Sequence, residues 1–461
     1  MLKAGFAKYD ITPRVGVGLY GFGPYLNRHS VAVRDYLEAR AAAFALDGKM
    51  AVIVGCDLCT LQAETCAKIR DIIIAKVPGL TKQDILIATS HTHSGPSTVF
   101  SDRGWGTPDP PYMELLPYKI AEAAILAVQN LEEMTVSAAL VPCRHIGLNR
   151  VYDRDAPPLA DVLKEDWEPA KPELTDTECR VIRFDNKQGE LKGFMAYFGC
   201  HPVVCCQQNH FIHGDYPAIA IHNLMRECPG SIGVFLQGAQ GDVNSGCVHK
   251  GENESLLALD VFAARFANAI RKGLAAATPL EIKDLATISQ PVEFSTRSDY
   301  TMEHLKELQE EFEKVLHTPL ANDDAYEVRM ATVNYLGVKK MMALLESDEK
   351  LSVTAEVQGI RLGPLAFLGA PFEIMQAIKN ETVSKSRAPM PMVMSLSNGA
   401  YGYAPDRQSL EEAKKSTRSG GYAATRVPFM QGRLPYANMH DELVNAFINI
   451  EAKLFPTATN K

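Results

Sequence analysis

The stretch Ile85-Leu-Ile-Ala-Thr-Ser-His-Thr-His-Ser-Gly-Pro96 joins an apolar run to two histidines and then to a turn. Side chains two residues apart on a strand share a face, so His91 and His93 are predicted to point into one pocket. Gly95-Pro96 ends the strand, and ligands usually bind at the carboxyl ends of strands in open α/β sheets. Because histidine is the commonest metal ligand and the usual proton carrier near neutral pH, the stretch predicts a site at a sheet edge. Two polar residues at an ordinary strand end are the alternative interpretation.

Four more apolar runs end in Gly or Pro with polar side chains attached. They are Phe194-Met-Ala-Tyr-Phe-Gly-Cys-His201-Pro202, Ile232-Gly-Val-Phe-Leu-Gln-Gly-Ala-Gln-Gly-Asp-Val-Asn244, Leu365-Ala-Phe-Leu-Gly-Ala-Pro-Phe-Glu373 and Met392-Val-Met-Ser-Leu-Ser-Asn398-Gly-Ala-Tyr-Gly-Tyr403. One such run is ordinary, but five with His, Asp, Glu and Tyr at their ends predict one site assembled from loops on a rigid sheet. The run from Ile232 carries Asp242 in its Gly-rich turn, which makes that carboxylate a candidate catalytic group.

Five short motifs along the chain match a known family in both order and spacing. They are Gly5-Phe-Ala-Lys-Tyr-Asp-Ile-Thr-Pro13, His91-Thr-His-Ser-Gly-Pro96, His201-Pro202, Gly241-Asp-Val243, and Asn398 followed by Tyr403 after four intervening residues. In this combination the chain resembles the neutral/alkaline non-lysosomal ceramidases. The resemblance runs from residue 5 to about residue 430. The combination is specific, although each motif alone is short.

The resemblance implies a zinc ion held by two histidines, a glutamate and a tyrosine, which correspond here to His91, His201, Glu373 and Tyr403. The donor set agrees with zinc chemistry, because zinc takes nitrogen and oxygen ligands in a four-coordinate shell and a catalytic site leaves room for water or substrate. A phenolate ligand is uncommon, and Tyr401 is a competing phenol two residues away. A buried tyrosine with a hydrogen-bonded hydroxyl is the other interpretation of Tyr403.

The resemblance also implies roles for three residues outside the ligand set. His93 is expected either to support the metal ligands or to act as an acid–base residue, and Arg150, in Gly147-Leu-Asn-Arg150, to contact the substrate oxygen. Tyr422, in Gly420-Gly-Tyr422, corresponds to a second catalytic tyrosine. For an isolated arginine or tyrosine, a surface salt bridge or simple packing is the alternative.

The chain departs from the ceramidases where their Gly-Asp motif continues to a serine that acts as the nucleophile or activates water. Here the run reads Gly241-Asp-Val-Asn-Ser245, so Asn244 occupies the matching position, and an amide cannot be that nucleophile. Ser245 comes one residue late, and a one-residue slip in an extended segment turns a side chain to the other face. We therefore expect the attacking water to be activated by zinc, which lowers the pKa of a bound water to about 7. Asn244 is expected to hydrogen-bond to the substrate or to that water.

A second departure lies at the end of the chain. Ceramidases of this type carry a β-sandwich domain after the catalytic domain, whereas this chain ends at Lys461, soon after a helical pattern at 439–454. We therefore expect one catalytic domain over residues 1–461 and no C-terminal β-sandwich. Docking at a lipid surface then loses part of its support, which favours a water-soluble substrate over ceramide itself.

Composition sets the outer limits on function. With 46% hydrophobic residues the chain can bury a large core, and its net charge of -8 argues against a nucleic-acid partner. The 10 cysteines predict small buried side chains and a reducing compartment, and Cys56-Asp-Leu-Cys59, without a second CxxC motif, is expected to be structural. Neither a leader peptide nor a transmembrane segment of about 20 apolar residues is visible. We therefore expect a cytoplasmic protein, or a secreted or periplasmic one whose leader has been removed.

Strand and helix patterns alternate, which predicts an α/β fold with a layered mixed sheet and flanking helices. The expected strands lie at 37–47, 50–57, 84–90, 135–142, 179–185, 192–199, 232–237, 352–361, 364–369 and 391–396, and the expected helices at 61–76, 113–130, 218–226, 256–275 and 441–454. Residues 152–176, rich in Asp, Pro and Glu, are expected to form a long surface loop. A charged helical hairpin is predicted as an insertion at 302–347, serving as a lid or a homo-oligomer contact, or forming a solvated excursion.

Three functions fit these patterns. The first is a zinc-dependent amidohydrolase resembling neutral ceramidase, which cuts an N-acyl amide or a related bond in a small or amphiphilic substrate. The second is a zinc-assisted hydrolase or lyase acting on a sugar-like polyol. The third is a non-catalytic binding protein that retains the metal, and the full ligand set together with Arg150 and Tyr422 argues against it. A deep apolar slot would favour the acyl substrate, whereas converging Asp, Asn, Arg and Trp105 side chains would favour a polyol.

Overall fold

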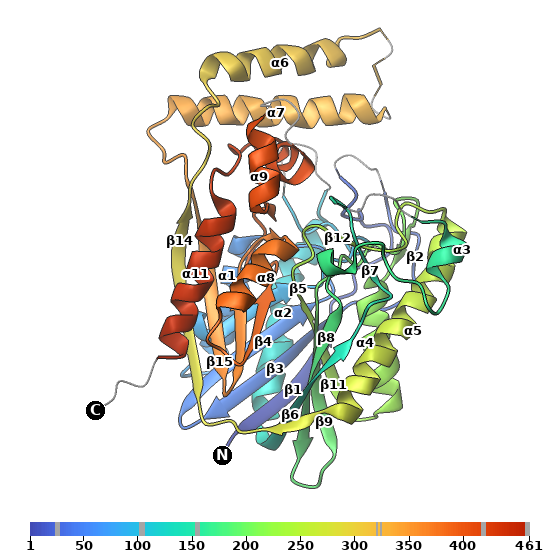
Figure 1. Ribbon diagram of the computed structural model, residues 1–461, viewed down its shortest axis with the longest axis vertical. Helices are drawn as coiled ribbons and strands as arrows, with labels where there is room; N and C mark the ends of the chain where they lie inside the picture. Colours follow the sequence, from blue (N-terminus) through green and yellow to red (C-terminus); the bar gives the residue numbers. More distant parts are fainter. Residues whose placement is uncertain are drawn as a thin grey trace.

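The computed structural model describes residues 1–23, 28–100, 107–152, 157–319, 321–322, 325–415 and 421–456. In this part of the chain, nine strands form one mixed sheet in the order β11-β9-β8-β6-β1-β3-β4-β5, with β13 also paired to β6 (Figure 1). These strands are β1 (Lys3–Asp10), β3 (Glu38–Leu46), β4 (Lys49–Cys56), β5 (Ile85–Thr89), β6 (Glu132–Pro142), β8 (Glu178–Asn186), β9 (Leu191–Phe198), β11 (Ile232–Gln237) and β13 (Thr278–Leu280). β1 and β6 pair only through Lys3 with Glu133 and Ala4 with Glu132, so the two halves of the sheet meet at a short corner.

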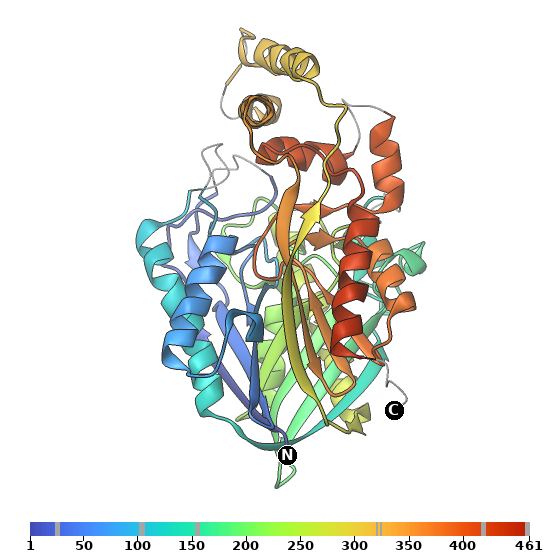
Figure 2. The ribbon, with the colours of Figure 1, turned by 90° about the vertical axis from the view of Figure 1, so that its left-hand side faces the viewer.

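A second sheet packs against the first across a shared apolar core. Its strands, in the order β14-β15-β16-β18, are β14 (Leu285–Phe294), β15 (Val353–Leu362), β16 (Leu365–Gly369) and β18 (Met390–Met394). Phe44, Met195 and Phe367 belong to this core, one from each of β3, β9 and β16. Side chains alternate between faces along a strand, so Ala41 and Ala43 of β3 face the other way, into the core under the helices. Figure 2 shows the two sheets between outer layers of helices.

Helices cover the outer faces of both sheets, as the alternating patterns predict. α1 (Ala63–Lys76) and α2 (Pro110–Gln129) pack on one half of the large sheet, and α4 (Asp215–Glu227) and α5 (Glu252–Ala276) on the other. α8 (Gln376–Lys385) and α11 (Met439–Leu454) cover the small sheet. The predicted layered mixed sheet with flanking helices is therefore confirmed.

The predicted helical hairpin forms as α6 (Met302–Leu316) and α7 (Tyr326–Glu346), which lie antiparallel at one end of the molecule (Figure 1). Leu305 and Leu308 of α6 pack against Val338 and Met341 of α7. α7 is the inner helix of the pair, and its Val333 is fully buried against the body of the protein. The hairpin is thus joined to the body along α7 and is more than a solvated excursion.

Two sequence expectations about local structure need correction. β1 and β14 were not expected as strands; β14 is an edge strand whose mostly half-exposed residues include Pro291, so it lacks a continuous apolar run. The described part of 152–176 is more than a surface loop, because Val162, in the short helix α3 (Leu159–Val162), and Trp167 are buried in the core beside α5. In the described part of the chain, no helix is both long enough and apolar enough to cross a membrane.

Candidate metal centre

Short segments at the ends of the long strands hold the proposed zinc ligands. His91 lies two residues beyond the end of β5 and His201 three residues beyond the end of β9. Glu373 and Tyr403 begin the two-residue strands β17 (Glu373–Ile374) and β19 (Tyr403–Ala404), which pair in parallel with Glu373 opposite Tyr403. Residues more than 300 positions apart in the chain are thereby brought to one edge, as the five apolar runs predict.

The histidine pair reaches this edge by a different route from the one expected. β5 ends at Thr89, so neither His91 nor His93 lies on a strand, and His91 has a positive φ of 71°. A positive φ is uncommon outside glycine. The two side chains nevertheless meet, with 3.2 Å between their Nε2 atoms, because the loop turns after the strand rather than continuing its alternation.

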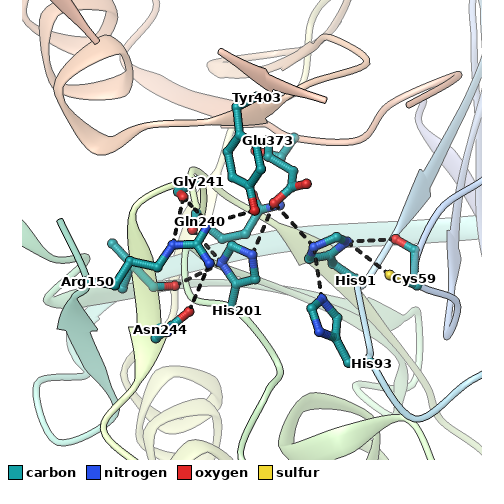
Figure 3. A network of polar contacts seen from close by, with 12 residues as sticks. Cys59, His91, His93, Arg150, His201, Gln240, Gly241, Asn244, Glu373 and Tyr403 are labelled. Carbon is teal, nitrogen blue, oxygen red and sulfur yellow. Dashed lines mark hydrogen bonds and ion pairs between the residues drawn. The ribbon is translucent and has the colours of Figure 1, made fainter. Parts of the chain in front are cut away.

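Three buried donor atoms of the proposed ligand set converge on one point. His91 Nε2 lies 3.3 Å and His201 Nε2 lies 3.1 Å from Glu373 Oε2. The three residues are 4%, 0% and 8% exposed, in that order. Figure 3 shows the two rings and the carboxylate turned toward one another, with Tyr403 next to Glu373. Their ligand atoms lie within 4.8 Å of one another, which is a spacing that one metal ion can bridge.

Backbone carbonyl groups fix the orientation of both imidazoles. His91 Nδ1 lies 2.8 Å from the carbonyl oxygen of Cys59, and His201 Nδ1 lies 2.6 Å from that of Gln240. A carbonyl oxygen only accepts, so each Nδ1 carries a proton, and in its neutral form each ring presents an Nε2 lone pair toward Glu373. Two lone pairs and an anionic oxygen repel one another unless a proton or a cation lies between them. The donor set therefore fits a divalent metal such as zinc.

His93 carries its ring proton on the other nitrogen from His91 and His201. Its Nδ1 accepts a hydrogen bond of 3.3 Å from the backbone N–H of Phe22, so the proton of the neutral ring sits on Nε2. Burial lowers the pKa of His93 well below its ordinary value, and the neighbouring His91 and His201 lower it further. A neutral His93 thus presents an N–H to the site, where His91 and His201 present lone pairs.

The charges at the centre favour an ionised carboxylate. Burial by itself would raise the pKa of Glu373, but the adjacent His91 and His201 outweigh it and hold that pKa well below its ordinary value. Burial lowers the pKa of His201 to about 4, and the nearby Arg150 charge acts in the same direction. An anionic oxygen beside a neutral His201 is the state that binds a cation.

Arg150 connects Tyr403 to the loop that carries Asn244. Its guanidinium donates to the Tyr403 hydroxyl at 2.6 Å, to the Gly241 carbonyl oxygen at 2.7 Å and to Asn244 Oδ1 at 3.4 Å. Burial raises the pKa of Tyr403, whereas the Arg150 charge opposes that rise. Tyr401, the competing phenol, lies under the guanidinium of Arg433 at 4.6 Å from its ring centre. Of the two, Tyr403 is the tyrosine that lines the cavity.

Asn244 and Ser245 point to opposite sides of one short strand. Both belong to β12 (Val243–Ser245), which pairs antiparallel with β7 (Gly147–Asn149). Asn244 lines the cavity. Ser245 is fully buried, and its hydroxyl donates to the carbonyl oxygen of Cys247 at 2.7 Å. The side chains of the two neighbours therefore face different environments, as the period of an extended segment requires.

Asp242, expected as a catalytic group, lies behind the site and does not reach the cavity wall. Its Oδ1 accepts from the backbone N–H of Gln376 at 2.8 Å, and its Oδ2 from Asn149 Nδ2 at 2.9 Å. Its carbonyl oxygen accepts from the backbone N–H of Arg150 at 2.8 Å. Asp242 therefore ties together the loops of Arg150, Asn244 and Glu373, which is a positioning role.

The centre opens into a cavity of about 1080 Å³. The expected residues His91, His93, Arg150, Asn244, Glu373, Tyr403 and Tyr422 all line it. Tyr422 is 44% exposed at the mouth, on the short π-helical turn Tyr422–Arg426, and its ring lies 5.8 Å from that of Tyr403. Met330 of α7 also lines the cavity, so the helical insertion supplies part of its wall. Trp105, weighed above as a polyol contact, falls outside the described residues.

Sequence reasoning missed Cys59. The prediction that Cys56-Asp-Leu-Cys59 is structural holds for Cys56, which is buried under α1. Cys59, however, lines the cavity, and its sulfur lies 3.5 Å from His91 Nδ1. The available signal in the sequence was its position three residues beyond the end of β4. Elsewhere in the described chain, Cys205, His213 and Asp215 form another compact donor group, but backbone N–H groups already occupy the Asp215 oxygens.

Comparisons with known proteins give one consistent result. The family model described as neutral/alkaline non-lysosomal ceramidase, N-terminal, matches residues 2–249. The neutral ceramidase of Pseudomonas aeruginosa is 24% identical over 252 residues, which are 52% of this chain and 37% of that protein. Neutral ceramidase A of Dictyostelium discoideum is 24% identical over 258 residues, which are 51% of this chain and 36% of that protein. The matched region thus spans well under half the length of these relatives.

Solved structures extend the likeness over the whole chain at the level of the fold. The crystal structure of neutral ceramidase from Pseudomonas aeruginosa superimposes with a TM-score of 0.71 and 18% identity, covering 100% of this chain and 76% of that one. A ceramidase complexed with C2 gives a TM-score of 0.73 and 19% identity with the same coverage. At this identity the likeness establishes the shared mixed α/β fold.

Proposed function

The chain belongs to the neutral/alkaline non-lysosomal ceramidase family, and from that premise we propose that it is a zinc-dependent hydrolase cleaving an N-acyl amide or a related bond. The observation that carries the proposal is the convergence of two imidazole lone pairs on the Glu373 carboxylate at the wall of a large cavity. His91, His201 and Glu373 would hold the ion, with the Tyr403 hydroxyl as fourth donor. A bound zinc would supply a Lewis acid that polarises the substrate carbonyl and lowers the pKa of a water molecule.

The chain's own residues would orient the substrate around this centre. Arg150, already bonded to the Tyr403 hydroxyl and to Asn244 Oδ1, places positive charge where a carbonyl oxygen would become anionic. Asn244 keeps its amide N–H₂ group for a substrate oxygen or a water molecule.

His93 and Tyr422 are assigned to hydrogen bonding with the substrate during proton transfer. The Nε2–H of the neutral His93 ring can hydrogen-bond to the substrate at the scissile bond, and the attacking water supplies the proton that the leaving nitrogen takes up. Tyr422, half exposed at the mouth, has a hydroxyl that can hydrogen-bond to an incoming substrate. With Ser245 bonded to Cys247, we propose that water, and no serine of this loop, attacks the substrate.

The lining of the cavity supports an acyl substrate over a polyol. Beside Tyr403 the wall is apolar, with Val151, Met330, Met375 and Val427 in one packed cluster. Apolar side chains next to the reacting centre gain contacts with an alkyl chain but leave sugar hydroxyl groups without partners. This is the feature that favours the first of the three functions considered.

The test combines metal analysis with a substrate panel. Pure protein should contain about one zinc per chain, and amides, esters and glycosides should be compared with and without a chelator. We expect amide cleavage that the chelator abolishes and added zinc restores. His91→Ala should lose metal and activity together, whereas His317→Ala, which alters an exposed histidine at the end of α6, should keep both. Cleavage that survives complete zinc removal would refute the proposal.

A further inference from the structure

The charge of the cavity differs in sign from that of the whole chain. The chain carries a net charge of -8. Among the described residues that line the cavity, the cationic side chains are Arg150, Lys340, Arg426 and Arg433, and the carboxylates are Glu373 and Glu412. Glu373 is engaged with the two histidines, and Glu412 is exposed on α9 (Arg407–Lys414). The wall built from α7 and from residues 421–433 is therefore locally positive.

Arg433 is the cation most constrained within this wall. It is partly buried, and its guanidinium stacks over the Tyr401 ring at 4.6 Å from the ring centre. Its Nη1 atom is buried and has no hydrogen-bond partner among the described residues. Among the described residues, no carboxylate oxygen lies within 4.0 Å of its guanidinium nitrogens. Removing a cation from water without a counter-ion costs free energy, so a ligand carboxylate would gain from meeting it there.

Two neighbours tie Arg433 to the metal centre. A Cβ placed on Gly432 would lie 2.8 Å from Lys340 Cδ, so the Lys340 side chain rests against the turn that precedes Arg433. A Cβ placed on Gly402 would lie 2.7 Å from Gln431 Oε1, so the amide of Gln431 packs on the backbone next to Tyr403. Polar groups from 431–433 thus flank the segment that carries the proposed tyrosine ligand.

The apolar and the cationic parts of the wall lie at different points along α7. Met330 belongs to the apolar cluster beside Tyr403, and Lys340 belongs to the cationic part. Ten residues of α-helix span about 15 Å at 1.5 Å per residue. A substrate lying along α7 would therefore meet an apolar surface at one end and positive charge at the other.

We propose that Arg433, with Gln431 and Lys340 beside it, forms a carboxylate subsite, and that the substrates are N-acyl amides whose amine portion carries a carboxylate. The inference rests on the proposed hydrolase function. A planar guanidinium held flat against an aromatic ring presents its remaining N–H groups in a fixed direction, which suits the two oxygens of a carboxylate. The acyl chain would lie against the Met330 cluster, and the carboxylate on the far side of the scissile bond.

The test compares amides that differ in the anionic group. N-dodecanoyl-glycine and N-dodecanoyl-4-aminobutanoate carry the carboxylate at two distances from the amide, and N-dodecanoyl-ethanolamine is neutral. We expect the protein to favour at least one of the two anionic amides over the neutral one by 10-fold or more in kcat/KM, on the order of one good charged contact. Arg433→Met should remove that preference, mainly through KM, and change neutral-amide turnover less than about 3-fold. Arg271→Met, an exposed cation paired with Glu227, is the charge-matched control and should keep the preference.

Two measurements, amide cleavage and amide binding, distinguish a failure of this inference from a failure of the hydrolase proposal. If none of the three amides is cleaved, the hydrolase proposal fails, and the same amides serve as ligands in calorimetric titrations of the wild type and Arg433→Met. Tighter binding of a carboxylate amide that depends on Arg433 would still support the subsite. Equal binding or turnover of anionic and neutral amides, or equal losses for both in Arg433→Met, would overturn it. Should Arg433→Met melt early, Arg433→Lys keeps the charge without the planar fork and should retain only part of the preference.

Discussion

The cavity has two unlike walls. On one side, His91 and Glu373 line the cavity and the fully buried His201 lies against Glu373; the two imidazoles are held by backbone carbonyl groups. On the other side, α7 and the π-helical turn present Tyr326 and Tyr422, which are 56% and 44% exposed. A metal site needs ligands fixed within a fraction of an ångström, whereas a wall that selects substrates needs only shape and charge.

The comparison separates two tasks. Substitutions on the strand-end wall should act on metal binding and on the chemical step. Substitutions on the helical wall should act on which substrate is held, and leave the metal in place.

His91→Ala should have the largest effect, because it removes one of three converging donors and leaves the Glu373 carboxylate buried with one partner fewer. We expect loss of zinc and a fall in activity on the order of 10⁴-fold or more. Elemental analysis of the purified variant gives the metal content. Stoichiometric zinc in His91→Ala would remove His91 from the ligand set.

His93→Gln and Tyr422→Phe should lower turnover while the metal stays near the wild-type level. The physical reason is that a positioned acid–base group contributes roughly 10²–10⁴-fold in rate. Turnover and zinc content should be measured on the same preparations. Complete metal loss in either variant would make that residue a ligand and would contradict the proton arrangement deduced for His93.

Asn244→Ala should reduce kcat/KM more than Ser245→Ala does. Leaving a partner of a site hydrogen bond unpaired costs about 1–3 kcal/mol, which is roughly 5- to 150-fold. Ser245→Ala removes a hydrogen bond directed to Cys247, away from the cavity, so its effect on rate should be small. Asn244→Ser restores the residue typical of ceramidases and is expected to permit attack by serine if the cavity accepts the amide.

Mass spectrometry of protein quenched during turnover checks whether the loop carries a covalent intermediate. We expect no acyl adduct on the wild type. An adduct on Ser245 would show that the loop rearranges when substrate binds and that serine chemistry operates.

Met330→Ala tests the helical wall. Removing this side chain should raise KM for long-chain amides several-fold and leave kcat and zinc content near wild type, because the contact is the same in the ground and transition states. A fall in kcat with unchanged KM would show that α7 also positions the reacting groups. Both walls would then contribute to the chemical step.

Glu381→Gln should give the smallest effect, and that effect is on the stability of the fold. Glu381 lies on α8, one of the helices that cover the small sheet. Hydrogen bonds from Lys385, His440 and Arg407 lower the pKa of Glu381 to about 2. A depressed carboxyl pKa stabilises the fold above its unfolded value near 4.5, and the stabilisation is lost as the pH falls toward 2. Wild type and variant should differ by about 1 kcal/mol at pH 7, since these contacts are partly solvated. Thermal melts from pH 7 down to pH 2 should show the difference disappearing; a constant difference would contradict the assignment.

Much of the layered fold follows from local patterns. The apolar runs at 50–57, 192–199 and 364–369 each became a strand close to its expected position, because a run with turn residues at both ends has few other ways to be buried. β14 escaped detection, since an edge strand with half-exposed residues and Pro291 has no such run.

For the candidate site, the sequence by itself determined which groups could meet: strand-end residues in a fixed order, and Asn244 where the family has serine. It could not determine their geometry. The left-handed backbone at His91, the opposite protonation of His93 and the Arg150–Tyr403 hydrogen bond, between residues 253 positions apart, depend on contacts between distant loops. Only the tertiary structure decided that α7 lines the cavity and that Asp242 supports the site from behind. Periodicity specifies which face of an element is apolar, whereas directional bonds form only after packing brings the loops together.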